Sequence, residues 1–252
     1  MIASKRYGWI PDLPDTRDHQ YSAPQETLSK LPASFDLRSK CPPVYNQGNL
    51  NSCTANAIAA AVQFDLMKQN DANFVPSRLF LYYNERVMAG NVNKDTGAPI
   101  RDGIKCIVRL GDCPETLWPY LTSKYAVKPP GPCYAQARKY QAVQYKRLTQ
   151  KPEQLKTCLA SGYPFIFGIK VYQSFESSEI EKTGHLFLPT QEQKSVGRHA
   201  VMAVGYDDSK EWLIVRNSWG DRWGIQGYFT LPYVYALNKD LSSDFWTLRV
   251  VT

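Results

Sequence analysis

Hydrophobic positions in the first half of the chain repeat with the period of a helix. Between Cys53 and Phe64, small apolar residues recur at i, i+3, i+4 and i+7, and two residues that favour helix starts, Asn51 and Ser52, come directly before. The abundance of alanine in this segment predicts a tightly buried helix. The same period, with its usual start and stop residues, predicts three more helices at about residues 76–90, 104–111 and 152–162.

The pattern changes after residue 162. Runs of β-branched and aromatic residues, separated by turn-forming residues, predict five strands at residues 165–171, 200–206, 211–216, 227–231 and 245–251. Helices first and strands later predict an α+β protein with a helical lobe at about residues 31–125 and a lobe with a sheet or partial barrel at about 126–252. A ligand site is expected in the cleft between them, because such sites favour domain interfaces.

The composition is that of an ordinary globular protein. Of the 252 residues, 43% are hydrophobic and 21% are charged, which excludes disordered, collagen-like and coiled-coil classes. The longest apolar run, residues 57–62, is far shorter than the roughly 18 to 20 residues that cross a bilayer, so no transmembrane helix is expected. No signal peptide is visible at residues 1–10, and both a secreted and a cytoplasmic location stay open.

The formal net charge of +7 is unevenly placed. Between Lys124 and Lys151 there are lysines and arginines but no acidic residue, and four tyrosines are interleaved among them. Such a stretch fits either contact with a nucleotide or nucleic acid, or a solvated basic segment whose tyrosines pack inward, and we favour the second interpretation. We therefore expect no nucleic-acid partner. With no transmembrane helix predicted we also expect no membrane partner, and we expect a monomer.

The cysteines do not form a metal-binding pattern. None of the six is part of a Cys-x-x-Cys pair or of a Cys/His cluster with the ligand spacing of zinc, so neither a metal nor a cofactor is expected. If one cysteine is a reactive thiol, at least one of the other five is unpaired. Their disulfide pattern stays open, and we expect all but Cys53 to be small core residues. The other five are Cys41, Cys106, Cys113, Cys133 and Cys158.

Cys53 lies where a thiol becomes reactive. The first turn of a helix places unpaired N–H groups and the positive end of the helix dipole beside the sulfur, which favours the thiolate. A nucleophilic thiol also needs an imidazole. His19 lies in a polar segment and His185 at a turn, whereas His199 begins a predicted strand of the lobe opposite Cys53. The positions predict that Cys53 and His199 face each other across the cleft.

Three segments around these residues resemble those of the papain-like cysteine peptidases. Residues 47–57 (QGNLNSCTANA) resemble the nucleophile motif of the family, residues 199–206 (HAVMAVGY) its histidine segment, and residues 217–228 (NSWGDRWGIQGY) its Asn-Ser-Trp-Gly signature. They occur in the family order, the resemblance runs from residue 31 to the end, and residues 95–120 are similar to bacterial and viral members. The resemblance implies a papain-like two-lobe fold, with a helical lobe and an antiparallel β lobe.

The same resemblance implies the roles of the site residues. Cys53 would attack a peptide carbonyl and form a thioester acyl-enzyme, with His199 as its ion-pair partner and proton donor and Asn217 orienting the imidazole. The side-chain amide of Gln47 and the Cys53 backbone N–H would form the oxyanion hole. Two tryptophans would shield the Asn217 to His199 hydrogen bond from water, namely Trp219 and Trp223.

Some positions depart from the family pattern. Leu50 stands where many members have a disulfide cysteine, Asn51 stands where a glycine in the wall of the S1 subsite is usual, and Thr54 replaces a tryptophan. Ala200 would line the S2 subsite. For Asp244 we favour a solvated turn carboxylate over one that points inward and selects a basic substrate side chain. The residues expected to contact substrate are Asn51, Ser52, Gly97, Arg198 and Ala200.

Residues 1–30 form a proline-rich, polar arm without clean periodicity, and the peptidase domain is expected at residues 31–252. An extended shape suits a substrate cleft, and Tyr7, Trp9 and Ile10 are available as anchors. We therefore expect the arm to cover the cleft and to restrain activity until it is cut or displaced.

The sequence thus predicts a thiol endopeptidase acting on proteins or peptides, since no His-His pair of the kind found in carboxydipeptidase relatives is present. Two alternatives stay open. One is an acyltransferase or other thiol hydrolase with the same Cys-His-Asn set, because a fold does not determine the acyl acceptor. The other is a catalytically weak binding protein of the same fold, suggested by Asn51 and Thr54.

Overall fold

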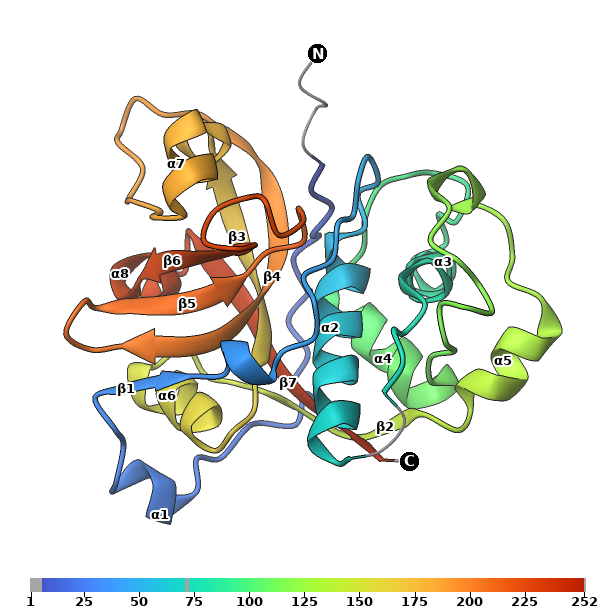
Figure 1. Ribbon diagram of the computed structural model, residues 1–252, viewed down its shortest axis with the longest axis horizontal. Coiled ribbons are helices and arrows are strands. Elements are labelled where there is room, and N and C mark those ends of the chain that lie inside the picture. The colour runs from blue at the N-terminus through green and yellow to red at the C-terminus, as the bar shows by residue number, and fades with distance from the viewer. Residues whose placement is uncertain (1–5, 71–72, 252) are drawn as a thin grey trace.

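The computed structural model describes residues 6–70 and 73–251, and the chain forms two lobes that lie side by side (Figure 1). One lobe is helical. Its helices are α2 (Cys53–Lys68), α3 (Arg78–Met88), α4 (Ile100–Leu110) and α5 (Gly131–Ala137). Within the described residues, no helix has the length and apolar character needed to span a membrane.

The other lobe is built on a twisted antiparallel sheet. The strands pair in the order β2-β7-β3-β4-β5-β6, and β1 pairs with β4. Their bounds are β1 (Ser34–Asp36), β2 (Gln141–Arg147), β3 (Phe165–Tyr172), β4 (Ser195–Asp207), β5 (Trp212–Arg216), β6 (Tyr228–Pro232) and β7 (Ser242–Val251). The shorter helices are α1 (Gln25–Leu28), α6 (Pro152–Ala160), α7 (Ser178–Thr183) and α8 (Tyr233–Leu237).

The helices and strands predicted from the hydrophobic pattern are confirmed, and others were missed. The four predicted helices correspond to α2, α3, α4 and α6, and the five predicted strands to β3–β7. The prediction missed the strands β1 and β2 and the short helices α1, α5, α7 and α8. Helix α5 packs on α3, with the rings of Tyr134 and Phe80 4.9 Å apart, so the helical lobe includes α5. Strand β4 begins at Ser195, so His199 lies inside this strand and not at its start.

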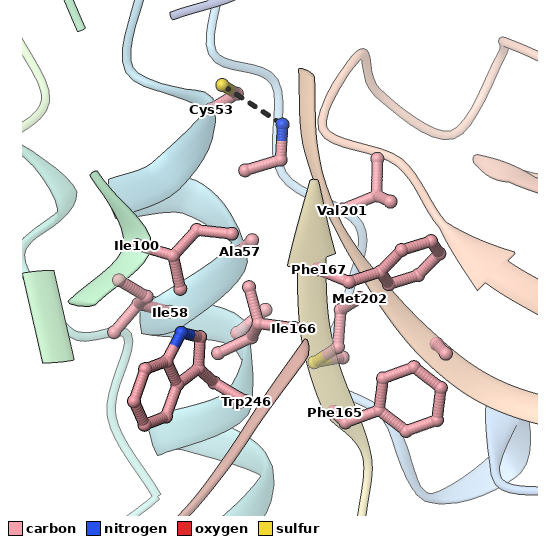
Figure 2. Packing of buried hydrophobic residues seen from close by; sticks show 14 of the residues in the cluster. Cys53, Ala57, Ile58, Ile100, Phe165, Ile166, Phe167, Val201, Met202 and Trp246 are labelled. Atoms are coloured by element: carbon pink, nitrogen blue, oxygen red, sulfur yellow. Dashed lines mark hydrogen bonds between the residues drawn. The ribbon is translucent and has the colours of Figure 1, made fainter. Parts of the chain in front are cut away.

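Helix α2 forms the seam between the lobes. Its residues from Cys53 to Leu66 are all buried, because helices contact one side and the sheet contacts the other. Figure 2 shows Ala57 of α2 on the side of Ile166 of β3, and Ile58 beside Ile100 of α4 and the indole of Trp246 from β7. Burying one such large apolar side chain stabilises a fold by about 1.5–3 kcal/mol. The alanine-rich sequence therefore fixes the first turn of α2 between the two lobes.

The basic stretch from Lys124 to Lys151 runs over the surface of this core. Its four tyrosines are partly buried and pack against the hydrophobic cluster, as the packing interpretation predicts; they are Tyr125, Tyr134, Tyr140 and Tyr145. All six cysteines lie in the described part of the chain, and every one is a free thiol.

Gly111 is required by close packing at the end of α4. Its φ of +73° is one that side-chain-bearing residues rarely adopt, and a Cβ there would lie 1.8 Å from the carbonyl oxygen of Ala137. We expect Gly111→Ala to lower the free energy of unfolding by about 2 kcal/mol or more, as measured by urea denaturation. Gly131→Ala is the matched control, because a Cβ there has open space. Equal stability of the two variants would contradict this account.

Candidate active site

The sulfur of Cys53 lies where the two lobes meet. Cys53 is the first residue of α2 and is fully buried. Its Sγ accepts a hydrogen bond of 3.3 Å from the backbone N–H of Ala200 in β4 (Figure 2). Because Ala200 directly follows His199, the thiol of the helical lobe lies beside the histidine of the β lobe.

The imidazole of His199 is held in one orientation. Its Nε2 is 2.8 Å from Oδ1 of Asn217, and the same oxygen accepts a hydrogen bond from the backbone N–H of Ser218. An oxygen that already accepts one N–H makes Nε2 of His199 the protonated nitrogen. Among the residues that the structure describes, Nδ1 of His199 has no hydrogen-bond partner. Nδ1 therefore keeps a lone pair for a proton.

Two tryptophans pack around this pair. The Trp219 ring lies 5.1 Å from the His199 ring at an angle of 30°. The Trp223 ring contacts Trp219 almost perpendicularly, with centroids 5.2 Å apart. The rings lie where the sequence predicted shielding from water.

Gln47 points a side-chain donor into the same region. Its Oε1 accepts a hydrogen bond from the Ser218 hydroxyl, and its Nε2 donates to the carbonyl oxygen of Leu50. Nε2 also donates to the carbonyl oxygen of Arg6, 3.1 Å away. A carbonyl of the amino-terminal arm therefore occupies this side-chain donor.

The arm crosses the cleft and is hydrogen-bonded to both lobes. In Figure 1 the amino-terminal segment, dark blue, passes between α2 and the sheet. The backbone N–H groups of Gly8 and Trp9 donate to the Arg198 carbonyl of the β lobe. The Gly8 carbonyl accepts from Ala98 N, and Ile10 N donates to the Ala98 carbonyl of the helical lobe. The arm is therefore a strand-like bridge over the site.

Tyr7 of the arm covers the catalytic histidine candidate. Its ring lies edge-on to His199 at 5.7 Å and also contacts Trp219. Its backbone N–H donates to Oδ1 of Asn51, whose Nδ2 is held by the Asp95 carbonyl at 2.7 Å. Asp95, which the sequence analysis did not single out, thus fixes the residue that replaces the family glycine. The one sequence signal for Asp95 is that it is an acidic residue in a loop rich in turn-forming residues.

The remaining residues predicted to contact substrate divide into two groups. Gly97 lies against Gly8 and Arg198 accepts from the arm, so both touch the segment that fills the cleft. The Ser52 hydroxyl instead lies 2.6 Å from the Tyr120 hydroxyl, and the backbone of Ala200 holds Cys53.

The prediction that Asp244 is a solvated turn carboxylate is wrong. Its side chain is 2% exposed, because three donors surround it. Arg147 donates to Oδ1, whereas the Trp9 indole N–H and the Asp12 backbone N–H both donate to Oδ2. The sequence around Asp244 could not predict these partners, because all of them are about a hundred or more residues away along the chain.

The other two histidines lie elsewhere. His185 bonds Thr230 through Nδ1 and stacks on Trp212, and His19 contacts the ring of Tyr145. Throughout residues 6–70 and 73–251, no three His, Cys, Asp or Glu side chains gather in a way that would hold a metal ion.

Comparison with known proteins places the chain in a family. Residues 31–237 match the model described as papain family cysteine protease. The chain belongs to this family. The peptidase C1-like protein L477 of Acanthamoeba polyphaga mimivirus, described as uncharacterized, is 40% identical over 99% of this chain and 88% of its own. The crystal structure of xylellain, a cysteine protease from Xylella fastidiosa, is 42% identical, covers 100% of both chains and has a TM-score of 0.93.

A more distant relative is cathepsin R of Mus musculus, which is 28% identical over 82% of this chain and 62% of the cathepsin. The chain thus spans about three fifths of that relative's length. The papain-like α+β fold, the hydrolase class and the resemblance to bacterial and viral members, all predicted from the sequence motifs, are confirmed.

Burial keeps the thiol and the imidazole of this papain-family protease neutral. Burial raises the pKa of Cys53 to about 12, although the backbone N–H of Ala200 and, to a smaller extent, those at the start of α2 lower it. Burial also lowers the pKa of His199 to about 4, against the hydrogen bond with Asn217. The expected thiolate at the helix start is therefore suppressed while the arm covers the site, because the loss of hydration outweighs the helix dipole.

The burial of His199 leads to a prediction for the pH at which its ring takes up a proton. Because its pKa is lowered, His199 takes up a proton only as the pH falls toward about 4. In NMR titrations of the full chain we expect the His199 ring to be neutral at pH 6. In Gly8→Ala, designed to displace the arm, its pKa should rise because water regains access. His199→Gln identifies the signal among only three histidines. The same titration in both chains would refute this explanation.

Proposed function

We propose that the protein is an endopeptidase that cleaves peptide bonds through Cys53, His199 and Asn217. One observation carries the proposal. The buried thiol at the start of α2 is hydrogen-bonded to the residue after His199, and the imidazole is fixed by Asn217 with its Nδ1 unpartnered among the described residues. A nucleophile, a base and an orienting group in this order are what thiol acyl transfer requires.

Each group has a defined step. Nδ1 of His199 takes the thiol proton, and the Cys53 sulfur attacks the peptide carbonyl carbon to form a tetrahedral intermediate. The imidazolium then gives its proton to the leaving amine, and the C–N bond breaks to leave a thioester. Water, deprotonated by the same imidazole, hydrolyses the thioester and restores the thiol. Asn217 keeps Nε2 protonated, so that Nδ1 remains the reactive nitrogen throughout.

Two donors would stabilise the oxyanion. The Gln47 amide is held by Ser218 and Leu50, so its remaining N–H, now bonded to Arg6, is already oriented. The backbone N–H of Cys53 supplies the second donor. Such a preoriented donor is worth about 3–4 kcal/mol in comparable sites.

The arm is proposed as a built-in inhibitor. Glycines on both sides allow its close approach, since a Cβ at Gly97 would lie 1.8 Å from the Gly8 carbonyl oxygen. A Cβ at Gly197 would lie 2.5 Å from the Tyr7 ring. Together with the Gln47 to Arg6 hydrogen bond, this fit supports an arm that excludes substrate until it is cut or displaced.

The proposed function is tested by labelling and by product analysis. The thiol-directed epoxide E-64 is incubated with the full chain and with Gly8→Ala, and intact mass and peptide mapping count and locate the adducts. One adduct, on Cys53, together with internal cleavage of a protein substrate to free carboxylates, is expected. A product in which an added amine replaces water would indicate an acyltransferase, and no adduct on either folded chain would refute the peptidase.

A further inference from the structure

The pocket that holds Trp9 is shaped for an indole. The Trp9 side chain is 6% exposed and lies flat against Gly168 of β3. A Cβ at Gly168 would lie 2.1–2.3 Å from three atoms of the indole, so the absence of a side chain there makes the space. At the end of the pocket, the indole N–H donates to Oδ2 of Asp244 over 3.1 Å. The pocket thus combines a broad apolar wall with one acceptor.

The two oxygens of Asp244 have different partners. Oδ1 accepts from Arg147 at 2.8 Å, within the body of the enzyme. Oδ2 accepts from Trp9 and from the Asp12 backbone, and both of these donors belong to the arm. The φ of +58° at Asp244, unusual for a residue with a side chain, holds the carboxylate in this place. When the arm leaves, Oδ2 loses both donors while Oδ1 keeps its ion pair.

The charges around the pocket change in the same step. With the arm docked, Arg101 pairs with Asp18 at 2.6 Å, and Arg147 pairs with Asp18 at 3.1 Å and approaches Asp12. These two aspartates leave with the arm. Arg147 of the body then keeps its ion pair with Asp244, while Arg101 loses its partner Asp18 and remains against the ring of Trp246. The surroundings of the vacated pocket therefore have an excess of positive charge.

We propose that this pocket selects peptide substrates carrying a tryptophan and discriminates against lysine and arginine. The inference rests on the proposed function and names the substrate class of the same cleft. An indole fills the space over Gly168 and returns a neutral N–H donor to Oδ2 of Asp244. A cationic side chain finds Asp244 already paired with Arg147, and it adds to the positive charge that the loss of Asp12 and Asp18 leaves nearby.

In the first experiment, Trp9 of the arm is substituted in the full-length chain, so that the arm itself tests which side chains the pocket accepts. Trp9→Phe keeps an aromatic ring but removes the N–H donor, and Trp9→Lys and Trp9→Arg bring a cation. The rate of Cys53 labelling by E-64 reports how weakly each arm docks. We expect Phe to raise this rate about tenfold, the loss of one hydrogen bond to a charged acceptor, and Lys and Arg to raise it at least as much. A Lys or Arg variant that labels more slowly than the wild type would overturn the proposal.

The second probe is a set of fluorogenic peptides cleaved by the full-length Gly8→Ala chain. Each of the four positions before the scissile amide is varied among tryptophan, 1-methyltryptophan, phenylalanine, lysine and arginine. At one position we expect tryptophan to give the highest kcat/KM, about tenfold above 1-methyltryptophan, which has no N–H. In Asp244→Gly, which tolerates the positive φ, this ratio falls to about one while the preference for a large ring remains.

The outcomes separate this inference from the proposed function. No Cys53 adduct in any folded variant overturns both. Normal labelling and cleavage with lysine or arginine preferred, or with equal rates for tryptophan and 1-methyltryptophan, overturns the substrate preference alone. If Asp244→Gly fails to fold, the methylated peptide still removes the same hydrogen bond on the intact pocket.

Discussion

Cys53→Ala, made in the Gly8→Ala chain so that the cleft is open, is expected to reduce peptide hydrolysis at least about 10⁴-fold. Without the sulfur there is no thioester, and the remaining groups can only orient the substrate and polarise its carbonyl. The Gln47 donor and the Cys53 backbone N–H are unchanged by the substitution, so a small residual rate is expected. The measurement is kcat/KM on a fluorogenic peptide, with E-64 adducts followed by intact mass.

The matched control is Cys106→Ala. Cys106 is also a buried cysteine within a helix, α4, and its sulfur contacts Met88. Cys106→Ala removes a thiol that is as buried as that of Cys53 but is distant from His199 in the sequence. It therefore measures how far the loss of a buried sulfur lowers stability while the proposed nucleophile is unchanged. If the Cys53 variant retained the rate of this control, the thioester mechanism would have to be abandoned.

The elements that carry Cys53 and His199, the residues proposed as nucleophile and base, could be predicted because their signals are local. Cys53 directly follows helix-start residues and opens an apolar 3.6-residue period, and His199 lies in a run of β-forming residues. Because α2 consists largely of small residues, it packs against both lobes and is buried on all sides, which places Cys53 at their interface. Sequence patterns of this kind determine which element carries a residue, and the two lobes bring the elements together.

The arm and its pocket could not be predicted in the same way. Residues 6–12 have no periodicity, and their path depends on glycines that are distant in the sequence, such as Gly97 and Gly168. The error at Asp244 has the same origin. Its local sequence is that of a turn, but its burial depends on Arg147 and Trp9, which come from other parts of the chain.

Strand β2 was missed for a related reason. Its residues, Gln141–Arg147, are mostly polar and only partly buried. They pair with β7 at the edge of the sheet, and the last of them, Arg147, also forms a bridge, to Gln20 of the arm. An edge strand with charged side chains lacks the alternation that reveals a half-buried strand. The basic stretch nevertheless has a structural role, because Arg147, the last residue of β2, forms the ion pairs with the arm and with Asp244.

Gly8→Ala is expected to raise the rate of Cys53 labelling by E-64 about 100-fold or more. Gly8 has a φ of +120°, a conformation that costs about 1–3 kcal/mol for a residue with a side chain. A Cβ there would also lie 1.9 Å from the Asn51 carbonyl oxygen. Neither penalty exists once the arm is released, so one methyl group shifts the equilibrium toward the open cleft without altering a residue of the peptidase domain.

Gly90→Ala separates this effect from general strain. Gly90 also has a positive φ, +69°, but a Cβ there meets nothing within 4 Å. It lies just after the end of α3 and is not part of the arm, so its substitution is expected to lower stability without opening the cleft. We expect the rate of Cys53 labelling by E-64 to increase in Gly8→Ala and not in Gly90→Ala, while circular dichroism shows that both variants are folded. This result would attribute the inhibition to docking of the arm. Equal labelling of Gly8→Ala and wild type would mean that the arm does not limit access, since the clash with Asn51 leaves it no room in the docked position.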